Sequence, residues 1–288
     1  MGLNRRIWAF LRGGNLVTAA LVLTIAISLG ACKSSEVTSS DFVDDVEPAD
    51  VLYNQALASM DEGKLSRALK KLEQLDEQHP YSEYSRKAMI LQTFIQYRRG
   101  QYVEAAALGQ RYVSLYPGDK DAAYAQYLVG MSHFRQIPDV TRDQTVTGKA
   151  HNAMAKLVEQ FPDSEYAEDA KTKIRITRDQ IAGKEMQTGR YYLERREYLA
   201  AINRFRHVAE NYQQTRHVEE ALARLAESYF ALGLASEAQS AAAVLGHNFP
   251  DSQWYADSVK LLKTGGLEPR ENPRSWLAAI GRSLAKKS

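Results

Sequence analysis

Apolar residues follow two patterns along the chain. Residues 16–29 form one run whose only polar members carry hydroxyls, and beyond Pro48 helix-length stretches alternate with short turns. At about 1.5 Å per residue the run is too short to cross a hydrocarbon core of roughly 30 Å comfortably. Arg5, Arg6 and Arg12 precede it, and small residues end it. This pattern favours a cleaved signal peptide over an anchoring helix.

The residues after this run are Leu29-Gly30-Ala31-Cys32, which resemble the lipobox of bacterial lipoproteins. The resemblance implies a lipoprotein signal peptide over residues 1–31, removed before Cys32. It also implies an N-acyl chain and an S-diacylglycerol lipid on Cys32, which would hold the protein at a membrane. Residues 32–48, rich in Ser, Thr and acidic side chains, are expected to be the acylated cysteine and a flexible linker. The alternative is an ordinary buried cysteine after a chance apolar stretch.

Five short turns punctuate the chain beyond the linker, and we take the second residue of each as its reference position. The reference positions are Pro80, Pro117, Pro162, Gln213 and Pro250. They lie 37, 45, 51 and 37 residues apart. These spacings are close to the period of solenoids built from two-helix repeats, with extra length in the middle.

Small residues keep a fixed register relative to the reference positions. Twelve residues before each reference stands an alanine: Ala68, Ala105, Ala150, Ala201 and Ala238. Seventeen residues before the first, second and fifth references stand Gly63, Gly100 and Gly233. A small residue is needed where antiparallel helices cross closely, and a glycine ends a helix by adopting a positive φ angle. Side chains suited to cap the next helix stand two residues after each reference: Ser82, Asp119, Ser164, Thr215 and Ser252.

This register resembles the tetratricopeptide repeat. It predicts an all-α tetratricopeptide-repeat solenoid of five helix-turn-helix repeats over residues 49–265. The expected helices are 50–62, 65–79, 83–99, 101–116, 120–136, 147–161, 199–212, 216–232 and 235–248, followed by a last helix after Ser252.

Two irregularities interrupt the repeats. Between Pro162 and Gly189 the only strong breaker is Gly183, and apolar or small residues recur mostly every three or four positions. This spacing predicts one long helix that joins the first three repeats to the last two. Residues 137–144 form an insertion between the two helices of the third repeat, and their composition predicts a loop.

Composition narrows the range of functions. The 288-residue chain has 37 Lys and Arg against 35 Asp and Glu, and its net charge of +2 provides no strong field for nucleic acid. A single cysteine excludes an internal disulfide framework and a four-thiolate zinc site. No phosphate loop, zinc-binding His-Glu-x-x-His or nucleophile elbow occurs. We therefore expect no enzyme, no metal and no cofactor apart from the lipid.

A solenoid offers a concave surface lined by the first helix of each repeat, which suits an extended peptide. In the tetratricopeptide family the groove-facing positions are the second, fifth, ninth and twelfth of the repeat. The candidates that these positions give for a substrate groove are Tyr53, Lys87, Phe94, Tyr97, Tyr124, Tyr127 and Phe134. Aromatic side chains provide contact area at low entropy cost, and a lysine can meet a carboxylate. The alternative is that several of them pack between helices.

The arrangement resembles the BamD family, tetratricopeptide-repeat lipoproteins of the outer-membrane β-barrel assembly (BAM) complex. Its landmarks, besides the lipobox and repeats, are Arg142-Asp143 in the insertion, Tyr-Tyr-Leu-Glu-Arg at 191–195, and Asn203-Arg204. The resemblance implies a non-enzymatic subunit on the periplasmic face of the outer membrane. It would dock on BamA and other BAM subunits through its C-terminal repeats, with the Arg204 guanidinium facing BamA. Its N-terminal repeats would receive unfolded outer-membrane β-barrel proteins, which carry a C-terminal aromatic signal.

Two features depart from the family. His79 stands where many relatives have a tyrosine, which leaves the detailed substrate pocket open. The second is the basic C-terminal tail, residues 266–288, in which large apolar residues have near-helical spacing: Trp276, Leu277, Ile280 and Leu284. The tail could form a short amphipathic helix that binds a partner or a membrane surface, or stay disordered, and we favour a partner or disorder.

Two other functions stay open. A tetratricopeptide lipoprotein could instead scaffold cell-wall enzymes, in which case it would copurify with peptidoglycan hydrolases or synthases. An enzyme with a site outside the known motifs would show turnover as a purified, partner-free chain.

Overall fold

The computed structural model describes residues 46–285; the predicted signal peptide, Cys32 and most of the linker lie outside this range. The chain divides into two units, Met1–Glu47 and Pro48–Ser288. Residues 46–285 form twelve α-helices without a strand. The helices are α3 (Ala49–Asp61), α4 (Leu65–Gln78), α5 (Glu83–Arg98), α6 (Tyr102–Leu115), α7 (Ala122–Phe134), α8 (Thr145–Gln160), α9 (Ala167–Glu194), α10 (Tyr198–Asn211), α11 (Val218–Ala231), α12 (Ala235–Asn248), α13 (Gln253–Thr264) and α14 (Trp276–Ala285).

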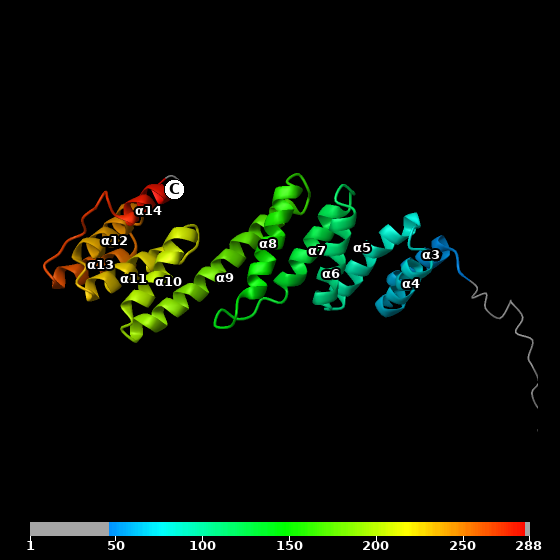
Figure 1. The fold of residues 1–288 in the computed structure, drawn as a ribbon, viewed down its shortest axis with the longest axis horizontal. Helices are drawn as coiled ribbons and strands as arrows, with labels where there is room; N and C mark the ends of the chain where they lie inside the picture. The colour runs from blue at the N-terminus through cyan, green and yellow to red at the C-terminus, as the bar shows by residue number, and fades with distance from the viewer. Residues whose placement is uncertain (1–45, 286–288) are drawn as a thin grey trace, which may run out of the picture. The chain divides into compact units, whose positions relative to one another are not determined.

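Each helix from α3 to α12 packs mainly against its neighbours in sequence, so that helix pairs follow one another along the unit (Figure 1). The five register alanines are completely buried: Ala68, Ala105, Ala150, Ala201 and Ala238. They allow the two helices of a repeat to approach closely. The predicted all-α tetratricopeptide-repeat solenoid is confirmed.

The turn inside a repeat requires a left-handed residue. Gly63, Gly100 and Gly233 have φ angles of 72°, 77° and 74°. Arg196, at the same register in the fourth repeat, has a φ of 62°. A left-handed arginine is strained because its Cβ crowds the backbone. The fourth repeat therefore makes the same turn as the others but without the residue best suited to it.

The predicted helix caps are only partly right. Ser82 is the N-cap of α5, and its hydroxyl accepts a hydrogen bond from the Ser85 amide at 3.1 Å. The second, third and fourth turns are longer than expected, because their next helices begin five residues after the reference, at Ala122, Ala167 and Val218. Asp119, Ser164 and Thr215 therefore lie two residues upstream of the caps, which are Asp121, Tyr166 and His217. Ser252 is the N-cap of α13, but its side chain makes no capping bond.

The long helix is confirmed as α9, whose 28 residues span about 42 Å. It packs against α8 on one side and α10 on the other. A Cβ on Gly189 would lie 2.5 Å from the Phe205 ring, so glycine is needed where α9 meets α10. The insertion is a loop that docks on α9: Gln180 Nε2 donates to the Pro138 carbonyl at 3.1 Å, and Lys184 Nζ to the Thr141 carbonyl at 2.6 Å.

The short amphipathic helix considered for the C-terminal tail is confirmed, but it docks within the same chain, whereas we favoured a partner or disorder. Residues 276–285 form α14, which packs against α12. Leu277, Ile280 and Leu284 are buried in the apolar core shared with α10, α11 and α12. The two prolines of the tail lie in the connection before the helix and do not interrupt it. The apolar face seen in the sequence thus finds its partner within the same chain.

Candidate functional site

The first helices of repeats one to three, with α6 and the turn before α7, line an open cavity of about 560 Å³. Of the seven groove candidates, the cavity brings together these four: Tyr53 from α3, Lys87 and Phe94 from α5, and Tyr124 from α7. Met60, Ile90 and Leu91 complete its apolar lining. The sequence-based groove positions therefore converge on one pocket, which we call the N-terminal pocket.

The N-terminal pocket is also bordered by charged side chains that lie outside the groove register. Arg86 and Lys120 add two cations to that of Lys87. Asp119 is already engaged, since its carboxylate accepts hydrogen bonds from the Asp121 amide at 2.9 Å and the Tyr112 hydroxyl at 2.8 Å. These bonds and the Arg86 guanidinium, 3.3 Å away, hold the pKa of Asp119 below its usual range.

Lys87 is better placed for a ligand than Arg86, which is paired with Asp119. Lys87 Nζ lies 3.5 Å from the exposed Glu83 carboxylate and 4.9 Å from the centre of the Tyr84 ring. Such exposed ion pairs are weak and exchange readily for another anion. The pocket can therefore hold an aromatic side chain among Tyr53, Phe94 and Tyr124 while a nearby lysine meets a carboxylate.

Tyr97, Tyr127 and Phe134 do not line the pocket, and the alternative of packing between helices applies to them. The Tyr127 hydroxyl donates to Asp169 Oδ2 at 2.8 Å; burial, and then this bond, raises the pKa of Tyr127. The Tyr97 hydroxyl accepts from Arg135 Nε at 3.2 Å, and Lys173 Nζ lies 5.3 Å from the Phe134 ring centre. These side chains connect α5, α7 and α9.

Tyr166, in the turn before α9, is a further aromatic residue that the groove register did not predict. Its ring centre lies 4.9 Å from that of Tyr127 and 5.4 Å from that of Tyr124. It therefore links the N-terminal pocket to the aromatic contacts behind it. Its place four residues after Pro162 lies outside the groove register, so only the spatial packing reveals it.

Arg204 lies on α10, at a second cavity of about 350 Å³. The cavity also brings together two of the family landmarks, Tyr192 and Asn203. Arg204 is 45% exposed, and its Nη1 donates to Glu185 Oε2 at 3.1 Å. The guanidinium is thus accessible and held in place by one carboxylate, with further N–H groups able to bind a second acceptor.

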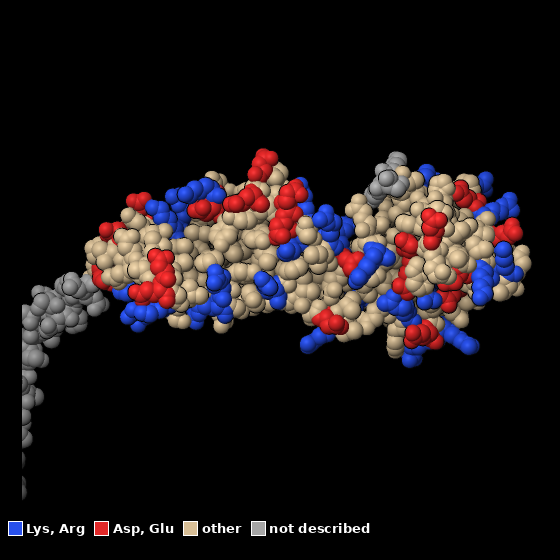
Figure 2. Space-filling model, turned by 180° about the vertical axis from the view of Figure 1, so that it is seen from behind, with Lys and Arg blue, Asp and Glu red and all other residues tan. Residues whose placement is uncertain are grey.

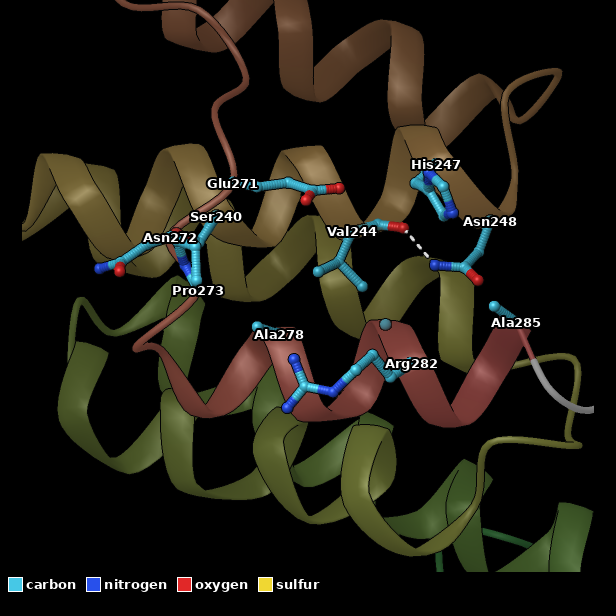
Figure 3. A pocket seen from close by; sticks show the side chains of 11 residues that line it. Ser240, Val244, His247, Asn248, Glu271, Asn272, Pro273, Ala278, Arg282 and Ala285 are labelled. Carbon is cyan, nitrogen blue, oxygen red and sulfur yellow. Dashed lines mark hydrogen bonds between the residues drawn. The ribbon is translucent and has the colours of Figure 1, made fainter.

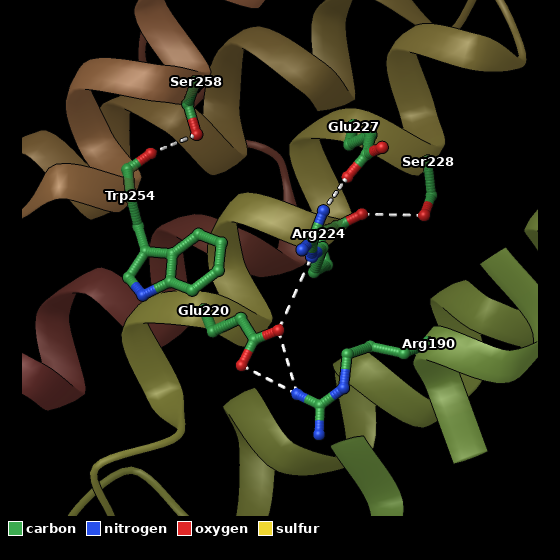
Figure 4. Close-up of polar contacts among 7 residues, drawn as sticks. All are labelled: Arg190, Glu220, Arg224, Glu227, Ser228, Trp254 and Ser258. Carbon is green, nitrogen blue, oxygen red and sulfur yellow. Dashed lines mark hydrogen bonds and ion pairs between the residues drawn. The ribbon is translucent and has the colours of Figure 1, made fainter. Parts of the chain in front are cut away.

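In the C-terminal half, which comprises the last two repeats, the first helices α9 and α11 carry a charged network (Figure 4) beside a smaller cavity of about 290 Å³. Arg190 Nη1 donates to both oxygens of Glu220, at 2.9 and 2.8 Å. Arg224 lies between Glu220, 3.5 Å away, and Glu227, 2.7 Å away, with its guanidinium 5.1 Å from the Trp254 ring centre. This network links α9, α11 and α13.

Charges of both signs intermingle over the face drawn in Figure 2, without a large area of one sign. Within residues 46–285 no group of three or more His, Cys, Asp and Glu side chains is arranged to hold a metal ion. No helix in this same range has the length and apolar character needed to cross a membrane. Cys32 lies outside the described residues, so its lipidation stays a prediction.

Residues 45–245 match the model of the YfiO family, described as an outer membrane lipoprotein. The chain is 42% identical over 278 residues to the outer membrane protein assembly factor BamD of Caulobacter vibrioides, covering 96% of this chain and 90% of that protein. BamD of Rickettsia prowazekii is 39% identical, with 84% and 95% covered. BamD of Neisseria meningitidis serogroup A is 31% identical, with 81% and 91% covered. The chain therefore belongs to the YfiO family of outer membrane lipoproteins, together with the BamD assembly factors.

Proposed function

We propose that this protein is a lipid-anchored, non-enzymatic subunit of the β-barrel assembly complex, working at the periplasmic face of the outer membrane. Its relatives are named outer membrane protein assembly factors. A solenoid of helix pairs presents extended surfaces and suits a role in holding other proteins. The anchor is an N-acyl and S-diacylglycerol lipid on Cys32. Several acyl chains on one residue hold a protein stably at a membrane, whereas a single chain binds only marginally.

The N-terminal pocket is the observation that carries the proposal. It binds the C-terminal aromatic signal of unfolded outer-membrane β-barrel proteins. The aromatic ring enters between Tyr53, Phe94 and Tyr124, and the terminal carboxylate meets the Lys87 ammonium. A charge-assisted hydrogen bond beside an apolar cavity selects a segment with both features.

The surface around Arg204 docks on BamA. Arg204 is exposed, and its partner Glu185 is only 20% exposed, so a carboxylate from BamA approaches the guanidinium from the solvent side. Bidentate pairing then gives orientation as well as affinity. The two halves of the protein thus divide the work, with substrate in the N-terminal pocket and BamA at α10.

A peptide titration tests the pocket. The probe is a short fluorescent peptide that ends in phenylalanine with a free carboxylate, compared with the same peptide ending in an amide. We expect Tyr124→Ala and the amide each to weaken binding about tenfold, or about 1.4 kcal/mol. Tyr81→Ala is the matched control, because Tyr81 is fully exposed and lies outside the pocket. Equal binding of acid and amide by all proteins would remove this pocket from substrate recognition.

A mild-detergent pull-down of the C-terminally tagged full chain tests the partners. We expect a large outer-membrane β-barrel with periplasmic domains, and we expect Arg204→Glu to reduce its recovery while Arg175→Glu, an exposed control on α9, does not. Recovery of peptidoglycan enzymes in its place would support scaffolding of cell-wall enzymes instead. Mass spectrometry of the N-terminal peptide would show whether Cys32 carries the lipid.

A further inference from the structure

Helix α14 is seated along α12 like a bound amphipathic peptide (Figure 3). Its apolar residues Leu277, Ile280 and Leu284 are spaced as one helix face, and all three are buried. They pack into the core that α10, α11 and α12 share. We call the surface that receives them the α10–α12 groove.

Specific contacts at both ends fix the position of α14. The Arg206 guanidinium of α10 lies 4.6 Å from the ring centre of Trp276, at the start of α14. Near the other end the Ser283 hydroxyl donates to Gln213 Oε1, at 2.8 Å. The groove therefore recognises an aromatic residue, three aliphatic residues and one hydroxyl in a defined order.

Helix α14 is short, and the segment that connects it to α13 is mostly exposed. The helix has only ten residues, and an isolated helix of that length does not persist in water. Residues 265–275, which connect it to α13, are tied to α12 by bonds at exposed positions: Gln239 Nε2 to the Glu268 carbonyl, 2.8 Å, and Asn272 Nδ2 to Ser236 Oγ, 3.2 Å. Its helicity therefore depends on docking.

An open crevice also follows the seam between α14 and α12. A cavity of about 220 Å³ runs along the seam, beside Val244 of α12 and Ala278, Gly281 and Ala285 of α14 (Figure 3). The polar side chains of Asn248, Asn272 and Arg282 also line the crevice, so solvent reaches the edge of the contact between the two helices. The helix also lies beyond residues 45–245, the part that matches the family model.

We propose that the α10–α12 groove is a receptor for an amphipathic helix, and that α14 is an exchangeable ligand within the same chain. The competing occupant is a partner protein's helix with large apolar residues at the spacing of Leu277, Ile280 and Leu284. When α14 leaves, the groove exposes the apolar surface that such a helix needs. This inference does not rest on the proposed function.

A cleavable full-length chain tests the exchange. A site-specific protease sequence is inserted between Pro269 and Arg270, and the C-terminal fragment is separated after cleavage. The probe is a fluorescent peptide of residues 270–288. We expect it to bind the cleaved protein but not the uncut one. The Leu277→Asp peptide should bind at least about tenfold more weakly, because it loses an apolar contact. The Ala279→Asp peptide, changed at an exposed position, should bind like the original.

The uncut Leu277→Asp protein provides a second, independent test. Its own α14 no longer fits the groove, so it should bind the original peptide without cleavage. The proposal is overturned if the fragment never exchanges with labelled peptide, or if cleavage unfolds the C-terminal repeats. It is also overturned if the Leu277→Asp and original peptides bind equally well. Any of these results would make α14 a permanent part of the fold.

Discussion

The two halves of the solenoid use the same surface differently. In the N-terminal half the first helices carry aromatic rings around an open pocket, and the ion-pair partner of its Lys87 is exposed. In the C-terminal half the first helices carry Arg190, Glu220, Arg224 and Glu227, which form ion pairs with one another, although the buried Arg224 Nε has no hydrogen-bond partner. The aromatic face has room for a ligand, whereas the charged side chains of the other face pair mainly with one another.

The difference shows that groove position alone does not make a binding site. A half-buried charged network is favourable only while all its members are paired, so it resists a new ligand and holds its helices in place. Half-buried aromatic rings and exposed lysines have no such requirement. The C-terminal half is therefore suited to be a rigid mount and the N-terminal half a receptor.

The largest effect we expect is a loss of stability on breaking the C-terminal network. Glu220→Ala leaves the Arg190 and Arg224 guanidiniums without their shared carboxylate, which is 15% exposed. Because both arginines are partly solvated, we expect a loss of about 2 kcal/mol, less than for a fully buried pair. Urea unfolding followed by circular dichroism measures it.

Lys87→Ala is the matched change in the N-terminal half, since it breaks an ion pair whose members are 44% and 71% exposed. Lys87→Ala should lower the free energy of unfolding by less than about 0.5 kcal/mol. Equal losses for the two variants would mean that the C-terminal network stabilises the fold no more than a surface pair does.

The second prediction concerns peptide binding. Here we expect the larger effect from a change in the N-terminal half, whereas stability is more sensitive to a change in the C-terminal half. Lys87→Glu should weaken the peptide that ends in phenylalanine about tenfold, or about 1.4 kcal/mol, because the new carboxylate repels the terminal one. Glu227→Lys, a charge reversal on the C-terminal network, should leave the peptide affinity unchanged. Fluorescence anisotropy at low and high salt separates them, and a similar effect of both would place the peptide outside the N-terminal pocket.

The third prediction exchanges a turn residue between the halves. Arg196→Gly should stabilise the protein by about 0.5–1 kcal/mol, because glycine accepts the positive φ that strains arginine. The reverse change, Gly100→Arg, should destabilise it by a similar amount. Thermal unfolding measures both. Arg195→Gly is the control, since Arg195 has a φ of −82° and gains nothing from glycine; an equal gain there would argue against strain at Arg196.

The sequence predicted the helices and the register well because both depend on local or regularly repeated features. The alanines and glycines recur once per repeat, and each meets the same neighbour geometry. The long helix followed from residues three or four apart. Four of the seven groove candidates line one pocket for the same reason.

What the sequence could not predict depends on contacts between distant segments. Tyr127 and Tyr97 occupy groove positions, but their hydroxyls hydrogen-bond to Asp169 and Arg135, so they do not line the pocket. The docking of α14 required knowing that α12 leaves an apolar surface uncovered. The cap predictions at Asp119, Ser164 and Thr215 were wrong because a turn that is two residues longer moves the helix start without changing the repeat spacing.

The smallest effect we expect is a pH dependence that comes in part from His217, at the junction between the halves. Burial lowers the pKa of His217, which lies just before α11, below its ordinary value. The folded state therefore favours the neutral ring: its contribution to stability is complete above about pH 6.5 and is lost as pH falls through the lower folded pKa. The pKa of Asp119 at the N-terminal pocket is lowered as well, so its contribution to stability is lost only below about pH 4.

Between pH 7.5 and 5.5 the free energy of unfolding should fall by less than about 1.4 kcal/mol for each such histidine and pH unit. His217→Gln should reduce that loss and exposed His247→Gln should not, as urea unfolding across this range would show. Burial also lowers the pKa values of His133 and His151, so part of the dependence should remain. An unchanged pH profile in His217→Gln would mean that His217 is solvated, and that the junction between the halves is looser than the described packing.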